Sequence, residues 1–332
     1  MKISKILDGF ILALISIIIL AWLFPNIGTN TQYMDLKKIS EYSITIIFFF
    51  YGVKLSPQKI REGLSNWKMH IVIQITTFII FPILVLITKP FFTDIHIWLS
   101  IFFVAALPST VSSSVVMVSL AKGNVPGAIF NATISSLGGI FISPLILSFF
   151  IVQSNIEINT SEILIKLLFQ ILVPMIAGIV LHNKLKIFAE KQSKRLKKLD
   201  QSIVLLIVYT SFCTSFESGI FNTIALSTIV FIFIGIGFLF LIVFVILKKI
   251  SSFFNFSYED TVTTIFCGSK KSLIHGVVLS KVLFSTTILS GFILVPIMIY
   301  HSLQLIAIGF LIPKMQTIIM KKKINQKKIY LF

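Results

Sequence analysis

Charged residues are scarce in this sequence. Only 12% of the 332 residues are charged, about half the share of an ordinary soluble domain. Hydrophobic residues make up 56%, and the mean hydropathy is +0.99. This composition excludes a typical soluble domain, because long apolar segments need hydrocarbon as their solvent. It predicts a single polytopic membrane domain over residues 1–332.

Arginine and cysteine are also rare. Arg61 and Arg195 are the two arginines among 29 basic residues, whereas proteins that read phosphates and bases favour arginine. We therefore expect no nucleic-acid partner despite the net charge of +17. The two cysteines, Cys213 and Cys267, lie inside apolar segments. This placement argues against a disulfide framework or a cysteine metal cluster and predicts two buried hydrophobes.

Acidic residues are few, and none lies in the middle of an apolar segment. The chain has twelve of them, placed in loops or near segment ends. Neither a Ser-His-Asp set nor a metal-ligand cluster is visible, so the sequence predicts no enzyme. The one cofactor that we consider is a sodium ion.

The apolar segments predict an all-α integral membrane fold. Crossing the hydrocarbon takes about 20 mostly apolar residues. Polar residues interrupt the fourth and ninth segments, so an eight-span chain with two re-entrant segments is the alternative. The ten predicted spans lie near residues 7–24, 39–54, 69–88, 97–120, 125–151, 163–182, 201–217, 222–247, 259–284 and 287–313.

The basic residues gather in alternate loops. If the N-terminus is inside, the even-numbered loops and the tail 314–332 carry most lysines, while residues 152–162 carry two acids. This is the positive-inside pattern, and it predicts cytoplasmic termini in a bacterial-type inner or plasma membrane. The basic connector 183–200 is interpreted as a topology determinant that contacts anionic lipid headgroups.

The connector divides the chain into two halves of five spans each. An odd number of spans inserts the second half upside down, which predicts inverted repeats over about 5–151 and 163–313. The interrupted span is the fourth of each half: "ALPSTVSSSVVMVSLAKGN" (106–124) and "FCGSKKSLIHGVVLSK" (266–281). Paired broken helices at equivalent positions point to a binding site near the bilayer midplane.

The first interrupted span combines a proline with hydroxyls. Pro108 removes a backbone donor and is expected to unwind the helix. The hydroxyls that follow are oxygen ligands for a small cation or donors to a carboxylate. Asn131 can add an amide. The alternative is that these groups bond to their own helix or allow close packing. The hydroxyl residues are Ser109, Thr110, Ser112, Ser113 and Ser114.

The second interrupted span carries two adjacent lysines, Lys270 and Lys271. Each costs about 2.5–3.5 kcal/mol at a helix centre, which nearly cancels the roughly 3–6 kcal/mol that the apolar residues of 259–284 return. The span therefore needs shelter from protein or a wet cavity. With no mid-span acid as partner, the ammonium groups point to an anionic ligand or stand where a cation would bind.

Three polar residues flank the lysines: Ser269, Ser272 and His275. His275 lies one turn from Lys271 and is either a proton relay or a packed neutral side chain. Both readings remain open at this stage.

Several short motifs together resemble the bile acid:sodium symporter family, over roughly residues 5–315. The resemblance is closer to a divergent branch of SBF-like membrane proteins, which runs from bacteria to one vertebrate member. The motifs are "GVKLS", "HIVIQITTFIIFP", "LPSTVSSSVV", "AIFN", "SPLIL" and "TVTTIFCGSKKSL".

The resemblance implies panel and core domains, crossing broken helices 4 and 9, two sodium sites and organic-anion transport by alternating access. Ser113 and Ser114 occupy the place of the family's Ser-Asn pair, and Asn131 falls where the fifth helix supplies ligands. The departure is "CGSKKSL", which replaces a run whose glutamate serves both sodium ions. We hypothesise that one lysine fills the role of a sodium ion.

Two functions follow from this sequence. The first is a secondary transporter of a small organic anion, which we do not expect to be bile acid itself. The alternative is a non-transporting membrane regulator, for example of cation entry, on the same fold. The sequence does not indicate the oligomeric state.

Overall fold

The chain is helical throughout the part that the structure describes. A computed structural model describes residues 9–30, 35–54, 66–110, 112–152, 165, 168–223, 225–284 and 291–307, and these residues contain no strand. Several of the helices are long and apolar, which agrees with the all-α membrane fold class predicted from the sequence.

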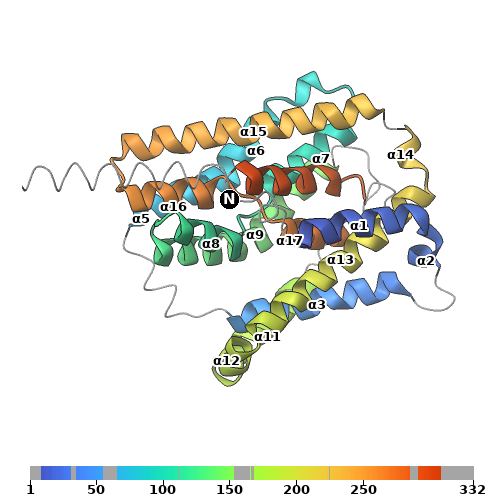
Figure 1. Ribbon diagram of the computed structural model, residues 1–332, viewed down its shortest axis with the longest axis horizontal. Helices are drawn as coiled ribbons and strands as arrows, with labels where there is room; N and C mark the ends of the chain where they lie inside the picture. The colour runs from blue at the N-terminus through green and yellow to red at the C-terminus, as the bar shows by residue number, and fades with distance from the viewer. Residues whose placement is uncertain are drawn as a thin grey trace, which may run out of the picture.

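Most helices run roughly along the long axis of the molecule (Figure 1). The segments before the first break are α1 (Gly9–Leu23), α2 (Pro25–Thr29), α3 (Leu36–Lys54), α5 (Trp67–Ile75), the π-helical turn η3 (Thr76–Ile80), α6 (Phe81–Leu86), η4 (Lys89–Phe91) and α7 (Ile95–Ala106). The later ones are α8 (Ser112–Leu120), α9 (Val125–Val152), η5 (Leu168–Leu172), α11 (Val173–Val180), α12 (His182–Lys191), α13 (Ser193–Glu217), α14 (Ile220–Thr223), α15 (Leu226–Phe253), α16 (Tyr258–Gly268), α17 (Leu273–Phe284) and a last helix, Leu294–Ala307.

Four described helices are long and apolar enough to cross a membrane: Trp67–Phe91, Val125–Phe150, Ser193–Glu217 and Leu226–Phe253. A fifth is added if the bent pair Leu168–Val180 and His182–Lys191 forms one span. The shorter apolar helices include the last one and α7. The ten-helix inverted repeat remains a prediction, because helix length and composition do not decide it.

The element boundaries correct the sequence prediction in two places. The expected spans 97–120 and 259–284 are each two helices, α7 with α8 and α16 with α17. The connector 183–200 was expected as a loop but forms most of α12 and the start of α13, with a turn at Gln192. The tail 314–332 lies outside the described residues.

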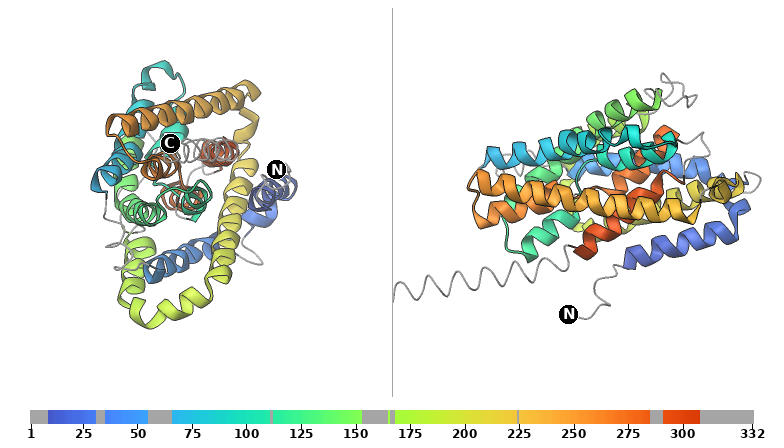
Figure 2. Two further views of the ribbon diagram at one scale, coloured as in Figure 1. Left: turned by 60° about the vertical axis from the view of Figure 1, so that its left-hand side comes forward. Right: turned by 90° about the horizontal axis from the view of Figure 1, so that it is seen from above.

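The helices form two groups, each drawn from both halves of the chain. In the lower group of Figure 1, α3 packs on α11, α12 and α13, and α1 packs on α13. In the upper group, α16 packs on α5, α8, α9 and α15. At the edge of the lower group, α12 turns by 95° from the segment before it (Figures 1 and 2).

Two glycines let α3 and α11 approach closely. A Cβ at Gly52 would overlap the carbonyl oxygen of Met175, and a Cβ at Gly178 would overlap that of Phe49. The crossing therefore requires glycine on both helices. This contact joins a helix of the first half to a helix of the second half.

Side-chain caps begin α5 and the two helices that end at the breaks, α7 and α16. Asn66 accepts from the Met69 N–H ahead of α5, and Asp94 accepts from the His96 N–H ahead of α7. Ser257 accepts from the Asp260 N–H ahead of α16. Each cap satisfies a backbone donor that has no intrahelical acceptor, so the sequence itself specifies these helix starts.

Candidate functional site

The two helix breaks lie against each other. α7 ends at Ala106 before Pro108, and α16 ends at Gly268. The Ser272 N–H donates to the Pro108 carbonyl at 2.9 Å, and Ser109 Oγ donates to the Cys267 carbonyl at 2.6 Å. Segments 158 residues apart in sequence therefore meet through their unwound backbone.

Hydroxyls of the first break form a compact cluster. Thr110 Oγ1 and Ser114 Oγ are 2.6 Å apart, and Ser113 Oγ donates to Thr110 Oγ1 at 2.9 Å. Ser114 is fully buried, and Thr110 is 6% exposed. The backbone of Ser112 opens α8, but its side chain lies outside the described part. The structure thus brings three of the five expected hydroxyls together, while Ser109 bonds across to α16.

Lys271 is completely buried, and its ammonium is enclosed by backbone carbonyls. Lys271 Nζ donates to the carbonyl oxygens of Thr77, Ala105 and Leu107 at 2.8, 2.7 and 2.8 Å. The nitrogen also lies 4.0 Å from the centre of the Phe81 ring. Three donated hydrogen bonds use all three protons of an ammonium.

Prolines explain why these carbonyls are available. Phe81 N–H bonds to Thr76 O in the π-helical register. The next donor in that register would be Pro82, which has no N–H, so Thr77 O is released. At the end of α7, the Leu107 N–H bonds to Val104 O in the 3₁₀ register. The next donor in that register would be Pro108, which has no N–H, so Ala105 O is released as well. Pro82 in α6 and Pro108 after the end of α7 therefore account for two of the three carbonyls that bind Lys271.

The backbone of Lys271 is also fixed. Its N–H donates to Gln304 Oε1 at 3.0 Å, and its carbonyl accepts from Gln304 Nε2 at 3.2 Å. Tyr300 donates to the Ser269 carbonyl at 2.5 Å, and Ser269 Oγ bonds back to Ile265 O. Sequence reasoning missed Gln304 and Tyr300. The feature of the sequence that could have identified them is a pair of polar side chains one turn apart in the last apolar segment.

Lys270 differs from its neighbour. It is also 0% exposed, but its Nζ has no hydrogen-bond partner among the described residues. The two adjacent lysines therefore have different environments, although the sequence presents them as equivalent.

Asn131 of α9 is bonded to side chains of α5 and to the backbone of its own helix. Its Nδ2 donates to the Gly127 carbonyl at 2.9 Å and lies 2.7 Å from His70 Nδ1. Its Oδ1 accepts from Gln74 Nε2 at 3.1 Å. Both amide protons are used in these bonds, and Asn131 does not line the cavity described next.

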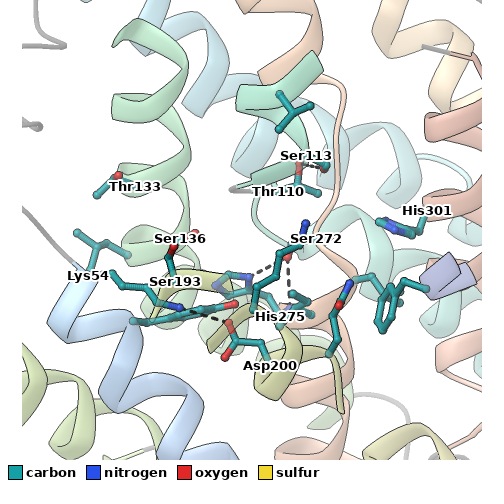
Figure 3. A pocket seen from close by; sticks show the side chains of 18 of the residues that line it. Lys54, Thr110, Ser113, Thr133, Ser136, Ser193, Asp200, Ser272, His275 and His301 are labelled. Atoms are coloured by element: carbon teal, nitrogen blue, oxygen red, sulfur yellow. Dashed lines mark hydrogen bonds and ion pairs between the residues drawn. The ribbon is translucent and has the colours of Figure 1, made fainter. Parts of the chain in front are cut away.

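A cavity of about 540 Å³ lies between the two helix groups (Figure 3). It takes residues from the first break (Thr110, Ser113), from the second break (Ser272, His275), and from α9, α3, α13 and the last helix. Apolar side chains such as Leu137 contribute much of the wall. Pro108, Ser114, Ser269, Lys270 and Lys271 do not line it.

Charged residues at one end of the cavity were missed as site residues. Lys54 Nζ lies 3.4 Å from Asp200 Oδ2, and the Asp200 side chain is 10% exposed. Lys197 also lines the cavity. Loop position suggested only a topology role for these lysines. The acid at the start of a predicted span was the signal that could have revealed the pair.

Ser272 and His275 form a local pair at the other break. Ser272 Oγ lies 2.8 Å from His275 Nδ1 and accepts, at 3.4 Å, from the His275 N–H. His275 is 5% exposed, and its Nε2 has no partner among the described residues. A buried imidazole with one unsatisfied nitrogen beside a cavity is a candidate ligand contact.

Broken apolar helices that meet beside a partly polar cavity are typical of membrane transport proteins. The model of the SBF-like CPA transporter family matches residues 8–317. The chain belongs to this family, which confirms the assignment to the bile acid:sodium symporter family.

Relatives from bacteria and vertebrates align along nearly the whole chain. The putative symporter YfeH of Escherichia coli is 32% identical over 314 residues, which cover 94% of this chain and 93% of the relative. Sodium/bile acid cotransporter 7 of Danio rerio is 30% identical, over 93% and 94%. An uncharacterized protein of Pseudomonas aeruginosa is 34% identical, over 92% and 91%. These similarities support a transporter function in an integral membrane protein.

Proposed function

We propose that the protein is a secondary active transporter that moves a small organic anion by alternating access. The observation that carries the proposal is the cavity of about 540 Å³ whose wall includes both helix breaks. A binding site between two helix groups becomes accessible from alternate sides of the membrane when one group rocks against the other. We propose no enzymatic reaction at this site, in keeping with relatives named as a cotransporter and a symporter.

We further propose that Lys271 is a tethered cation that replaces a sodium ion. Three carbonyl oxygens at 2.7–2.8 Å form the kind of oxygen cage that unwound backbone offers to coupling ions. The Phe81 ring adds a favourable face for a cation. Because the ammonium is covalently attached, it supplies this charge in every state of the transport cycle.

Transport would then be independent of sodium and coupled to protons or to an exchanged anion. The alternative sodium set is Ser113, Ser114 and Asn131. Against it, the two hydroxyls belong to a cluster closed by Thr110, and the Asn131 amide is bonded to His70, Gln74 and Gly127. This arrangement favours Lys271 over sodium as the source of positive charge.

The membrane placement is part of the proposal. We propose ten membrane helices in two inverted repeats, both termini in the cytoplasm, and a bacterial-type inner or plasma membrane. Anionic headgroups would contact α12, which is bent by 95° from Leu168–Val180. Its exposed Ile187 (59%) and Phe188 (51%) accompany lysines, a composition suited to the membrane interface.

The test is organic-anion uptake into proteoliposomes. Uptake by the wild type should persist when choline replaces sodium. In the choline medium, Lys271→Ala should abolish this uptake, while the matched change Lys248→Ala, at an exposed lysine of α15, should not. Uptake that disappears without sodium would reject the tethered cation but keep the transporter.

The regulator alternative predicts a different result. In that case, no anion in a broad screen would enter proteoliposomes that contain folded wild-type protein. Thermal-shift titrations with and without sodium select the anions for this screen.

A further inference from the structure

We propose that the first turn of α17, with His275 as its specificity-determining donor, is the subsite that binds a carboxylate in the cavity. This inference rests on the proposed function, in which the ligand is an organic anion. It assigns the anion to His275 rather than to the paired lysines.

The Ser272 hydroxyl determines which imidazole nitrogen carries the proton. Ser272 Oγ accepts the His275 backbone N–H and lies 2.8 Å from Nδ1. Because Ser272 Oγ already accepts the His275 N–H, we assign its hydroxyl as the donor to Nδ1. The neutral ring then carries its proton on Nε2, and this tautomer is assigned from the hydrogen-bond network.

The Nε2–H group is a buried donor without an acceptor. His275 is 5% exposed, and its Nε2 has no partner in the described part of the chain. Tyr51 and Phe48 hold the ring, with centroids 5.5 and 6.4 Å away. In Figure 3 His275 lies between Ser272 and the Lys54–Asp200 pair, and all four residues line the cavity. An unsatisfied buried donor costs free energy, which a ligand acceptor would recover.

The helix itself adds two more donors and a favourable field. The first-turn N–H groups of a helix have no intrahelical acceptor. The Ser272 hydroxyl takes that of His275, and the Gly276 N–H makes the first i→i−4 bond, to the Ser272 carbonyl. The N–H groups of Leu273 and Ile274 are left without an acceptor among the described residues. Both line the cavity. α17 is 12 residues long, and its N-terminus carries a partial positive charge that favours an anion.

The other cations near the cavity are consistent with a singly charged ligand. Lys271 already donates three hydrogen bonds, and neither Lys270 nor Lys271 lines the cavity. Lys54 is paired with Asp200, so Lys197 supplies the unbalanced positive charge among the described lysines and acids of the wall. A ligand with one carboxylate and an otherwise apolar structure therefore complements the charge and polarity of the cavity wall.

The experiment measures binding to purified full-length protein by isothermal titration calorimetry. The probes are benzoate, 2-naphthoate and cholate, each compared with its neutral primary amide. The variants are His275→Phe, which keeps a ring but loses the donor, and His275→Gln, whose amide nitrogen can replace Nε2. The control is His96→Phe, at a histidine that does not line the cavity.

The wild type should bind at least one carboxylate more tightly than its amide. His275→Phe should weaken that binding by about 10–100-fold, as loss of a hydrogen bond to a charged group does, while His275→Gln and His96→Phe keep it. Equal binding of carboxylate and amide, unchanged binding in His275→Phe, or no carboxylate bound by the wild type would each overturn the subsite. None of these results decides transport. Binding through His275 without uptake would instead reject the transporter proposal and retain the subsite.

Discussion

Replacing Lys271 with alanine should destabilise the protein and create a site for a free cation. The substitution leaves three buried carbonyl oxygens without their donor. Hydrogen bonds to a charged group contribute about 1.5–3 kcal/mol each, so three amount to about 4.5–9 kcal/mol if they add. Folding would no longer bury an ammonium, whose penalty is several kcal/mol. This gain offsets part of the loss, so the expected net loss is on the order of a few kcal/mol.

The assay is thermal denaturation of purified full-length protein in one detergent. Lys271→Ala should melt well below the wild type, and sodium or butylammonium should restore part of the loss, because either cation can enter the vacated oxygen cage. Choline is too large for the cage and should not restore it. Lys270→Ala is the matched control, since that lysine is equally buried but has no carbonyl partner in the described part of the chain. An unchanged melting temperature in Lys271→Ala, or no difference between sodium and choline, would refute this reasoning.

Three further substitutions test the remaining structure. Lys270→Met should raise the melting temperature, because it removes a fully buried ammonium that has no partner among the described residues; a lower value would mean that Lys270 has a counter-charge. Gly52→Ala should abolish accumulation of folded protein, because its Cβ would overlap backbone of α11, whereas Gly235→Ala, with open space around it, should be tolerated; equal yields would contradict the close crossing. Asp200→Asn should lower stability by at most about 1 kcal/mol, since the Lys54 side chain is 34% exposed and water can solvate it once its acid is lost, and a melting curve identical to the wild type would show that the pair contributes nothing.

The sequence predicted the fold class and the location of the helix breaks. Low charge and long apolar segments predict the membrane fold class, because a soluble domain of this length could not bury so much apolar surface. Pro108 and the "CGSKKSL" stretch predict the location of the two helix breaks, because a missing N–H and paired lysines both interrupt a membrane helix. These features are local, so a linear reading can detect them.

The distinction between Lys270 and Lys271 depends on contacts across the fold. Thr77 and Ala105 lie 194 and 166 residues from Lys271, and only packing brings their released carbonyls to its ammonium. The cavity likewise joins Lys54 to Asp200, 146 residues further along the chain. Spacing within one helix contains no information about such partners. Composition and local periodicity therefore determine that the chain is a membrane bundle with two broken helices, while three-dimensional packing determines which charge is satisfied and which donor remains open for a ligand.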